Sequence, residues 1–247
     1  MGILRLVLRA LWIVSALLVC LPLHYSWRLF GASSPWPRRF LRWVGRAAGM
    51  RVRIVGQPQE RDVLFLANHL SWLDILVLAG ASGTAFVAKA EVAETPVVGW
   101  LAGLNNTVFV ARAERHAVRH QADALREALA SGQPVALFPE GTTEGGPSVL
   151  PFRASLLSAL FPPLPGIRVQ PVALDYGPAA HDLAWIGEES GLANVKKVLA
   201  RRGTTAVTLN FLPPVDPGDG NRKTLAHSAR EEIVTALSAS ATGADRL

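Results

Sequence analysis

From residue 51 onward, short apolar runs alternate with segments of helical periodicity. Seven of these runs are typical of β-strands, at residues 51–56, 62–67, 84–89, 107–111, 134–138, 168–176 and 205–212. Helices are expected at residues 71–80, 97–104, 114–131, 153–161 and 222–237. Strands that alternate with helices predict an α/β fold, in which a mixed β-sheet is flanked by helices.

The first 50 residues form a basic and apolar segment. Every arginine up to Arg53 precedes Glu60, which is the first acidic residue of the chain. Tryptophan and phenylalanine residues, together with long aliphatic runs, separate these arginines. A basic arm of this composition favours an anionic membrane surface over nucleic acid. We therefore expect a membrane partner and no nucleic-acid partner.

The first apolar run in this segment is short for a membrane-spanning helix. Residues 10–23 carry no charge, and at about 1.5 Å per residue they cover about 21 Å, less than the roughly 30 Å hydrocarbon core. Extension back to Leu6 makes a full span feasible if Arg9 reaches the head groups. A cleavable signal peptide is disfavoured, because no A-x-A site follows the run and Trp27 and Arg28 continue the segment.

Residues 35–50 are predicted to form an amphipathic basic helix. Phe40, Leu41 and Val44 lie on one side at helical spacing, and arginines surround the other side. Such a helix suits the head-group layer of a membrane, although an ordinary surface helix has the same pattern. The two N-terminal helices are predicted to dip into one leaflet as a hairpin, with a true single span as the alternative.

The pattern divides the chain into three parts. Residues 1–50 are expected to be membrane-associated helices, residues 51–240 a catalytic α/β domain, and residues 241–247 a frayed tail. Cys20 is the only cysteine, so an intrachain disulfide is excluded, and no Cys/His cluster has the spacing of a zinc site. We therefore expect no metal.

A histidine and an aspartate, His69 and Asp74, lie five residues apart in the otherwise apolar stretch ANHLSWLDIL. On one continuous helix their side chains would point about 140° apart and could not meet. They can meet if His69 lies in the turn before a helix that begins near Ser71 as its N-cap, with Asp74 in the first turn. The pair then forms a general base and its orienting carboxylate, although a purely structural His–Asp pair fits the same spacing.

A second polar group follows the strand at residues 134–138. The loop FPEGTT supplies the carboxylate of Glu140, the glycine Gly141, which allows a ligand to approach the backbone, and the hydroxyl of Thr142. Ligands of open α/β sheets gather beyond the carboxyl ends of strands, and this loop lies at such an end. The alternative is a polar turn with Glu140 in solvent.

Three basic side chains are candidates for anion recognition. Arg112 ends the strand TVFVAR, Arg153 follows the Glu140 loop, and Lys89 ends another strand. The bidentate guanidinium of arginine suits a phosphate group. Arg112 and Arg153 are also compatible with surface charges.

Four segments, in this order, resemble conserved blocks of the glycerolipid acyltransferases, the PlsC-type 1-acylglycerol-3-phosphate acyltransferase family. They are NHLSWLD, which resembles the family's N-H-x-x-x-x-D block, TVFVAR, FPEGTT and VQPVAL. The segment AKAEVAETPVVGW, between the first two blocks, is also similar. The resemblance covers residues 63–174, and the N-terminal hairpin fits the membrane-docking element of that family.

The resemblance implies acyl transfer from acyl-carrier protein or coenzyme A to the free hydroxyl of a lysolipid. His69 would be the general base and Asp74 its orienting group, while Glu140, Gly141 and Arg112 would hold the polar head of the acceptor. No cofactor beyond the acyl donor is implied. A protein of this kind is expected at the cytoplasmic face of a bacterial-type inner membrane.

One residue departs from the family pattern. Many members that form phosphatidate have arginine after PEGT, whereas this chain has Thr143. The segment is also similar to members that acylate lyso-ornithine lipid, so lysophosphatidate is the first predicted acceptor and lyso-ornithine lipid the alternative. A hydrolase is disfavoured because the G-x-S-x-G motif is lacking, and a non-catalytic lipid-binding protein would not need the His69–Asp74 pair.

Overall fold

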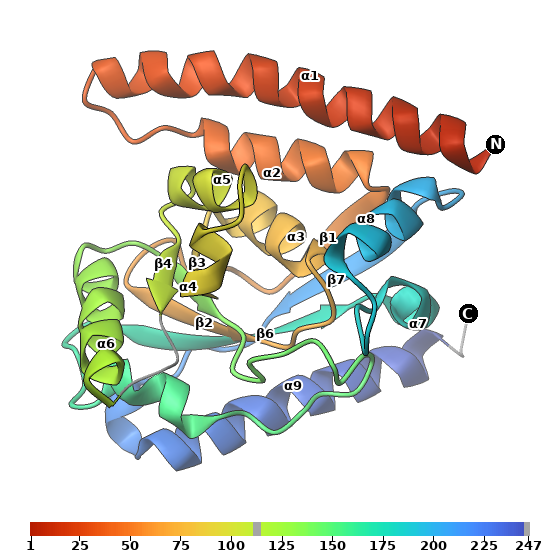
Figure 1. The fold of residues 1–247 in the computed structure, drawn as a ribbon. Helices are drawn as coiled ribbons and strands as arrows, with labels where there is room; N and C mark the ends of the chain where they lie inside the picture. The colour runs from red at the N-terminus through yellow and green to blue at the C-terminus, as the bar shows by residue number, and fades with distance from the viewer. Residues whose placement is uncertain (111–114, 245–247) are drawn as a thin grey trace.

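A computed structural model describes residues 1–110 and 115–244 of the chain (Figure 1). Seven strands form one sheet in the order β1-β7-β6-β2-β5-β3-β4. Neighbouring strands are parallel except β6 and β7, which are antiparallel. The strands are β1 (Met50–Val55), β2 (Val63–Ala67), β3 (Ala85–Lys89), β4 (Val108–Val110), β5 (Val135–Leu137), β6 (Arg168–Asp175) and β7 (Thr205–Phe211). The predicted mixed sheet is therefore confirmed, and each strand lies where the sequence pattern predicts one.

Helices lie on both faces of the sheet (Figure 1). The α-helices are α1 (Gly2–Leu29), α2 (Trp36–Ala47), α3 (Leu73–Ser82), α4 (Ala90–Ala93), α5 (Val98–Leu104), α6 (Arg115–Ala130), α7 (Ala180–Leu183), α8 (Gly191–Ala200) and α9 (Arg222–Ala244). Three short 3₁₀ helices are η1 (Ala154–Leu160), η2 (Gly177–Ala179) and η3 (Pro217–Asp219).

The residues of β2 alternate between two hydrophobic cores. Phe65 and Ala67 pack in the core under α1, α2, α3 and α8, whereas Leu64 and Leu66 pack in the core that α6, η1 and α9 cover. Successive side chains of a strand point to opposite faces, so a continuous apolar run is required wherever helices cover both faces. This explains why the sequence of β2 has no polar residue.

The helical hairpin predicted for the N-terminus is present. α2 folds back beneath α1 and packs on α3 (Figure 1). A side chain at Gly80 of α3 would lie 2.9 Å from the Cα atom of Arg42, so this glycine allows α2 to cross α3 closely. Phe40 and Val44 of α2 are buried in this contact, as the amphipathic pattern predicts.

Several arginines of the hairpin donate hydrogen bonds to main-chain carbonyls of the α/β domain. Arg5 Nε donates to Ala200 O at 3.0 Å, and Arg9 Nη1 donates to the carbonyls of Val198 and Leu199 at 3.1 and 3.2 Å. These carbonyls belong to the last turn of α8, where a cation is favoured by the helix dipole. The N-terminal half of α1 is therefore attached to the domain, and part of the basic charge expected for lipid serves this attachment.

The structure differs from the sequence prediction at several helix ends. α3 begins at Leu73, two residues later than expected, and Ser71 is not its N-cap. The predicted helix at residues 153–161 is the 3₁₀ helix η1, and α9 continues to Ala244, beyond the point where a frayed tail was expected. The sequence pattern did not predict α4, α7 or α8, because α4 and α7 have four residues each and α8 carries only three buried residues.

Candidate active site

The site forms at the carboxyl ends of three adjacent parallel strands. β6, β2 and β5 are neighbours, and their last residues are followed by Tyr176, by His69 and by Glu140. Because parallel strands end at the same edge of a sheet, loops that are distant in sequence converge there. The two loops that the sequence identified, at His69 and at Glu140, are therefore brought together by the strand order.

His69 and Asp74 make the contact that their spacing predicts. His69 lies in the turn after β2, Asp74 lies in the first turn of α3, and His69 Nδ1 is 2.8 Å from Asp74 Oδ2. The imidazole is partly exposed, with 18% of its side chain accessible, whereas the aspartate is fully buried. The contact uses Nδ1, so Nε2 is the imidazole nitrogen left for a substrate.

The buried carboxylate of Asp74 accepts four hydrogen bonds. Besides His69, the main-chain N–H groups of Leu70 and Ser71 donate to Oδ2 at 2.6 and 2.9 Å. The Tyr176 hydroxyl donates to Oδ1 at 2.6 Å. Burial, followed by the negative charge of Asp74, raises the pKa of Tyr176 well above its usual value, so this hydroxyl remains a donor. These bonds stabilise the ionised carboxylate inside the protein.

Glu140 is not a solvent-exposed loop residue, because it is 1% exposed. Its Oε1 accepts from the main-chain N–H of His69 at 2.7 Å, and its Oε2 accepts from that of Leu150 at 2.8 Å. Burial raises the pKa of Glu140, although the two N–H donors oppose that shift. The carboxylate therefore holds the turn that carries His69, and the polar-turn alternative is wrong.

Aromatic rings connect His69 to an apolar cavity. The imidazole stacks on Phe138 with ring centroids 4.0 Å apart, and Phe138 stacks on Phe86 at 5.8 Å. Phe86 lines a cavity of about 400 Å³, whose wall also includes Trp72, in the turn after His69, and Ile75 of α3. The cavity extends between α1, α2, α3 and α5 and is lined mainly by aliphatic and aromatic side chains. It has the size and character of a hydrophobic ligand site.

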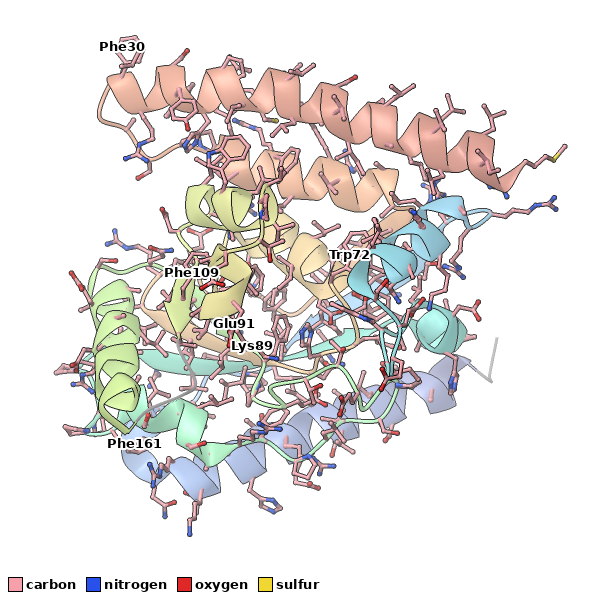
Figure 2. All side chains as sticks on the ribbon, viewed as in Figure 1. Phe30, Trp72, Lys89, Glu91, Phe109 and Phe161 are labelled. Carbon is pink, nitrogen blue, oxygen red and sulfur yellow. The ribbon has the colours of Figure 1, made fainter. Side chains whose placement is uncertain are left out.

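A segment that the sequence did not single out packs against the turn that carries His69. The main-chain N–H of Trp185 donates to Leu70 O at 3.1 Å, and the carbonyl of Trp185 accepts from Thr143 Oγ1 at 2.5 Å. In α8, the buried Asn194 accepts from the indole N–H of Trp72 at 2.9 Å. Figure 2 shows Trp72 beside α8. Thr143 thus joins the Glu140 loop to the segment that borders His69.

Of the remaining predicted residues, Gly141 and Thr142 lie in the Glu140 loop, whereas the side chains of Arg153 and Lys89 are exposed. Gly141 follows Glu140 with φ +72°, a left-handed conformation that favours glycine, and Thr142 Oγ1 accepts from the N–H of Glu144 at 3.3 Å. The main-chain N–H of Arg153 donates to Pro139 O at 2.9 Å, but its side chain is exposed. Lys89 is also exposed, at the end of β3 (Figure 2). Neither cation has a described side-chain contact with His69, Asp74 or Glu140.

Arg112 lies outside the described residues. It follows β4, which ends at Val110 at the edge of the sheet. The role expected for Arg112 in anion binding stays a prediction.

Comparison with known proteins identifies the class. Residues 51–175 match the family model described as Acyltransferase. A lyso-ornithine lipid O-acyltransferase of Brucella abortus is 33% identical over 98% of this chain and 97% of its own length. A 1-acyl-sn-glycerol-3-phosphate acyltransferase of Neisseria gonorrhoeae is 38% identical over 49% of this chain and 48% of its own.

A solved structure has the same fold. The crystal structure of the 1-acyl-sn-glycerophosphate acyltransferase PlsC from Thermotoga maritima matches with a TM-score of 0.64 and 25% identity, over 96% of this chain and 97% of the other. The fold and the family match define an O-acyltransferase of the glycerolipid type. The chain belongs to the acyltransferase family, as the four sequence blocks predict.

Proposed function

We propose that His69 is the general base of an acyl transfer to a lysolipid hydroxyl. The single observation that carries this proposal is the 2.8 Å contact between His69 Nδ1 and the buried carboxylate of Asp74, beside an apolar cavity. Asp74 holds the imidazole in one orientation, so that Nε2 can accept a proton. Ser71, two residues after His69, is fully buried and its Oγ accepts from the N–H of Leu73, so the substrate hydroxyl is the nucleophile and the transfer is direct.

The chemical step follows from this arrangement. The acceptor hydroxyl attacks the carbonyl carbon of an acyl thioester while its proton moves to His69 Nε2. The tetrahedral intermediate then breaks its carbon–sulfur bond, and the leaving thiolate takes up the proton from the imidazolium. The products are an ester and a free thiol, and no cofactor beyond the thioester takes part. Positioning of the two substrates supplies much of the rate.

The cavity supports the site of the acyl chain. Its wall includes Phe86, which stacks on Phe138, and Phe138 in turn stacks on the imidazole of His69. An acyl chain that lies in the cavity would therefore have its carbonyl end near the base. Apolar chains gain about 25 cal/mol for each Å² of surface removed from water. Acyl-carrier protein and coenzyme A both deliver such a chain as a thioester, and either donor satisfies this arrangement.

Lyso-ornithine lipid is the acceptor that the observations favour. The relative named for that acceptor matches nearly the whole chain, whereas the Neisseria relative matches half of it. Thr143, which replaces the arginine of many phosphatidate-forming members, donates its hydroxyl to Trp185 O and supplies no cation. The zwitterionic head group of lyso-ornithine lipid requires less positive charge than a phosphate dianion.

Lysophosphatidate is the second candidate, and the sequence alone ranked it first. It is favoured by the arginine at position 112, in the block where the family binds phosphate, and by the Neisseria relative. If Arg112 binds the phosphate of the acceptor, Arg112→Ala lowers kcat/KM more for lysophosphatidate than for lyso-ornithine lipid. Equal losses with both acceptors argue against a phosphate-binding role.

The base assignment is tested with purified full-length protein and a panel of both acceptors, each with acyl-carrier-protein and coenzyme A thioesters. His69→Ala is expected to lower kcat by at least about a hundredfold, as for loss of a general base. His181→Ala, at an exposed histidine of α7, is the matched control and retains activity. Turnover by His69→Ala at the wild-type rate would exclude His69 as the base.

We also propose that the protein docks on the cytoplasmic face of a bacterial inner membrane through α1. Among the described residues, α1 is the one helix long and apolar enough to cross a bilayer. Its exposed side includes Leu4, Leu8, Leu11 and Leu18, and Figure 2 shows Phe30 projecting outward at its end. A contiguous exposed apolar surface of this kind supports insertion into one leaflet.

A further inference from the structure

A second cavity lies between α2, α3 and β1, apart from the apolar cavity beside His69. It has a volume of about 570 Å³, and we call it the α2–β1 cavity. Its wall includes three arginines, Arg42 and Arg46 of α2 and Arg51 of β1. Among the described residues, no acidic side chain lines it. The cavity is therefore positively charged and suits an anionic ligand.

The three arginines keep their positive charge available for such a ligand. Arg42 Nε donates to Gly80 O at 2.9 Å, and Arg51 Nε donates to Thr204 Oγ1 at 3.0 Å. These bonds orient the two side chains, and both acceptors are neutral. In the part of the chain that the structure describes, none of the three arginines forms a salt bridge. A phosphate group would supply the missing negative charge, because the guanidinium fork matches its geometry.

One wall of the α2–β1 cavity is apolar. Val52 and Ile54 of β1 line it and are 42% and 46% exposed, and Leu76 of α3 lines it beside them. β1 is the edge strand of the sheet, and each of its residues after Met50 is exposed. Exposed apolar side chains next to arginines indicate a ligand that is anionic at one end and apolar at the other, as a phospholipid is.

Gly45 of α2 leaves space in this cavity. It lies inside the helix, where glycine is less favourable than alanine. A Cβ atom at this position would lie 3.7 Å from Leu76 Cβ, which is an ordinary contact, so the packing of α2 on α3 does not require glycine here. Because Gly45 lines the cavity, a larger side chain at this position would occupy it without a change of charge.

The α2–β1 cavity borders the helix that we propose to dock on the membrane. Thr204 lines the cavity, and the carbonyl of the preceding Gly203 accepts from Arg9 Nη2 of α1 at 3.1 Å. α2 ends beneath the N-terminal half of α1 and leads into β1 (Figure 1). With α1 in one leaflet, the cavity lies beside the lipid head groups.

We infer that the α2–β1 cavity binds one anionic phospholipid, with its phosphate on the arginines and the start of an acyl chain on Val52 and Ile54. This lipid is not a substrate, because no lining residue belongs to the turn of His69 or to the Glu140 loop. The inference goes beyond the proposed acyl transfer and relies on the proposed docking only for the source of the lipid. It gives the protein a second attachment to the membrane, in addition to α1.

Native mass spectrometry of the full-length protein, released from detergent, tests the inference without any requirement for turnover. Dioleoyl phosphatidylglycerol and dioleoyl phosphatidylcholine carry the same acyl chains and differ in net charge. The first phosphatidylglycerol is expected to bind about tenfold more tightly than the first phosphatidylcholine, because hydrogen bonds between ionised partners are stronger. Equal affinities would overturn the inference.

Three variants assign the preference to the α2–β1 cavity. Arg46→Gln and Arg51→Gln each remove one cation, and Gly45→Leu fills the cavity with no change of charge. Each is expected to weaken phosphatidylglycerol binding about fivefold and to leave phosphatidylcholine binding unchanged. The matched controls are Arg53→Gln, at an exposed arginine of β1 that does not line the cavity, and Gly45→Ala. An equal loss in Arg53→Gln would indicate attraction by the net charge alone and overturn the inference.

Thermal unfolding shows which variants are folded, and if Gly45→Leu is not, the comparison of Arg46→Gln and Arg51→Gln with Arg53→Gln still decides. Glycerol 1-phosphate has the phosphate but no acyl chain. If it displaces phosphatidylglycerol at millimolar concentration, the cavity binds a soluble phosphate and the lipid assignment is overturned. A lost preference for phosphatidylglycerol with normal acyl transfer contradicts this inference alone. A preference in a protein that transfers no acyl group supports the inference and contradicts the proposed function.

Discussion

At the scale of single residues, Asp74 is the group on which the site depends. Its Oδ2 accepts from His69 Nδ1 and from two main-chain N–H groups, while its Oδ1 accepts from the Tyr176 hydroxyl. The main-chain donors cannot be removed by substitution, but the tyrosine hydroxyl can. Tyr176 therefore offers a way to weaken the contacts of Asp74 without a change to His69, the proposed base.

Tyr176→Phe is expected to lower kcat about tenfold and to leave KM nearly unchanged. A hydrogen bond to a charged group contributes about 1.5–3 kcal/mol, and Tyr176 is too deeply buried to touch the substrate. Steady-state kinetics of the variant measure both constants, with Tyr25→Phe, at a half-exposed tyrosine of α1, as the control. A rise in KM with an unchanged kcat would contradict the role assigned to Tyr176.

Glu140 gives the site a pH-dependent contribution to stability. Burial raises its pKa above the unfolded value of 4.5, so the folded state binds this proton more tightly than the unfolded state does. The contribution is fully present below pH 4.5 and is lost as pH rises through the folded pKa. In Glu140→Gln this dependence is absent, and the amide NH₂ group faces one main-chain N–H, which destabilises the fold at every pH.

The stability gap between wild type and Glu140→Gln is therefore expected to narrow as pH rises from about 4.5 towards neutrality. Urea unfolding of both proteins at several pH values measures it, since the other titrating groups are common to the pair. Glu144→Gln, at an exposed glutamate of the same loop, is the control and should track the wild type. A gap that widens with pH would mean that the pKa of Glu140 is lowered.

Tyr176 also illustrates what the sequence did not reveal at this scale. It lies 102 residues after Asp74 and follows a strand whose neighbours are set by the sheet order. The His69–Asp74 contact was predictable because it depends on five residues of local geometry. Contacts of Asp74 with Tyr176, and of His69 with Phe138, depend on which strands are adjacent, and periodicity does not encode that order.

At the scale of elements, the strands were predictable and α8 was not. An apolar run such as residues 62–67 identifies a strand covered on both faces. In contrast, α8 carries only three buried residues, Asn194, Val198 and Leu199, and one of them is polar. Its buried polar residue, Asn194, accepts the hydrogen bond from Trp72. The residue that made α8 hard to predict from the sequence therefore also links it to the turn that carries His69.

Thr143 is the residue through which this second segment reaches the Glu140 loop. Thr143→Val removes the hydroxyl that donates to Trp185 O and keeps the side-chain shape, whereas Thr143→Ser keeps the hydroxyl. A neutral hydrogen bond contributes about 1 kcal/mol, so Thr143→Val is expected to lower kcat/KM about fivefold with every acceptor. Thr143→Ser should restore the wild-type value.

Thr143→Arg tests the relation of this position to the acceptor. The longer side chain cannot replace the short hydroxyl bond to Trp185, and it adds a cation beside Glu140. The ratio of kcat/KM for lysophosphatidate to that for lyso-ornithine lipid is expected to rise in this variant, even if both values fall. An unchanged ratio would mean that residue 143 does not contribute to the choice of acceptor.

At the scale of the whole molecule, the attachment of α1 to α8 bears on the proposed docking on a membrane. α1 has 28 residues and is about 42 Å long, enough to cross a bilayer. In its first turns, however, Arg5 and Arg9 donate hydrogen bonds to main-chain carbonyls of α8. A crossing would draw this end of the domain into the hydrocarbon, where irregular backbone cannot be satisfied, or would break these bonds. The attachment therefore favours α1 lying in the plane of one leaflet.

Cysteine labelling distinguishes the two arrangements. In a Cys20→Ala background, Gly2→Cys marks the start of α1, and His181→Cys marks the α/β domain at an exposed position. If α1 lies in the plane of the leaflet, a membrane-impermeant maleimide outside sealed vesicles modifies both cysteines to the same extent, because Arg5 and Arg9 hold residue 2 beside α8. A helix that crosses the bilayer would protect one of the two until detergent is added. Protection of Gly2→Cys alone would therefore mean that the bonds to α8 break on docking.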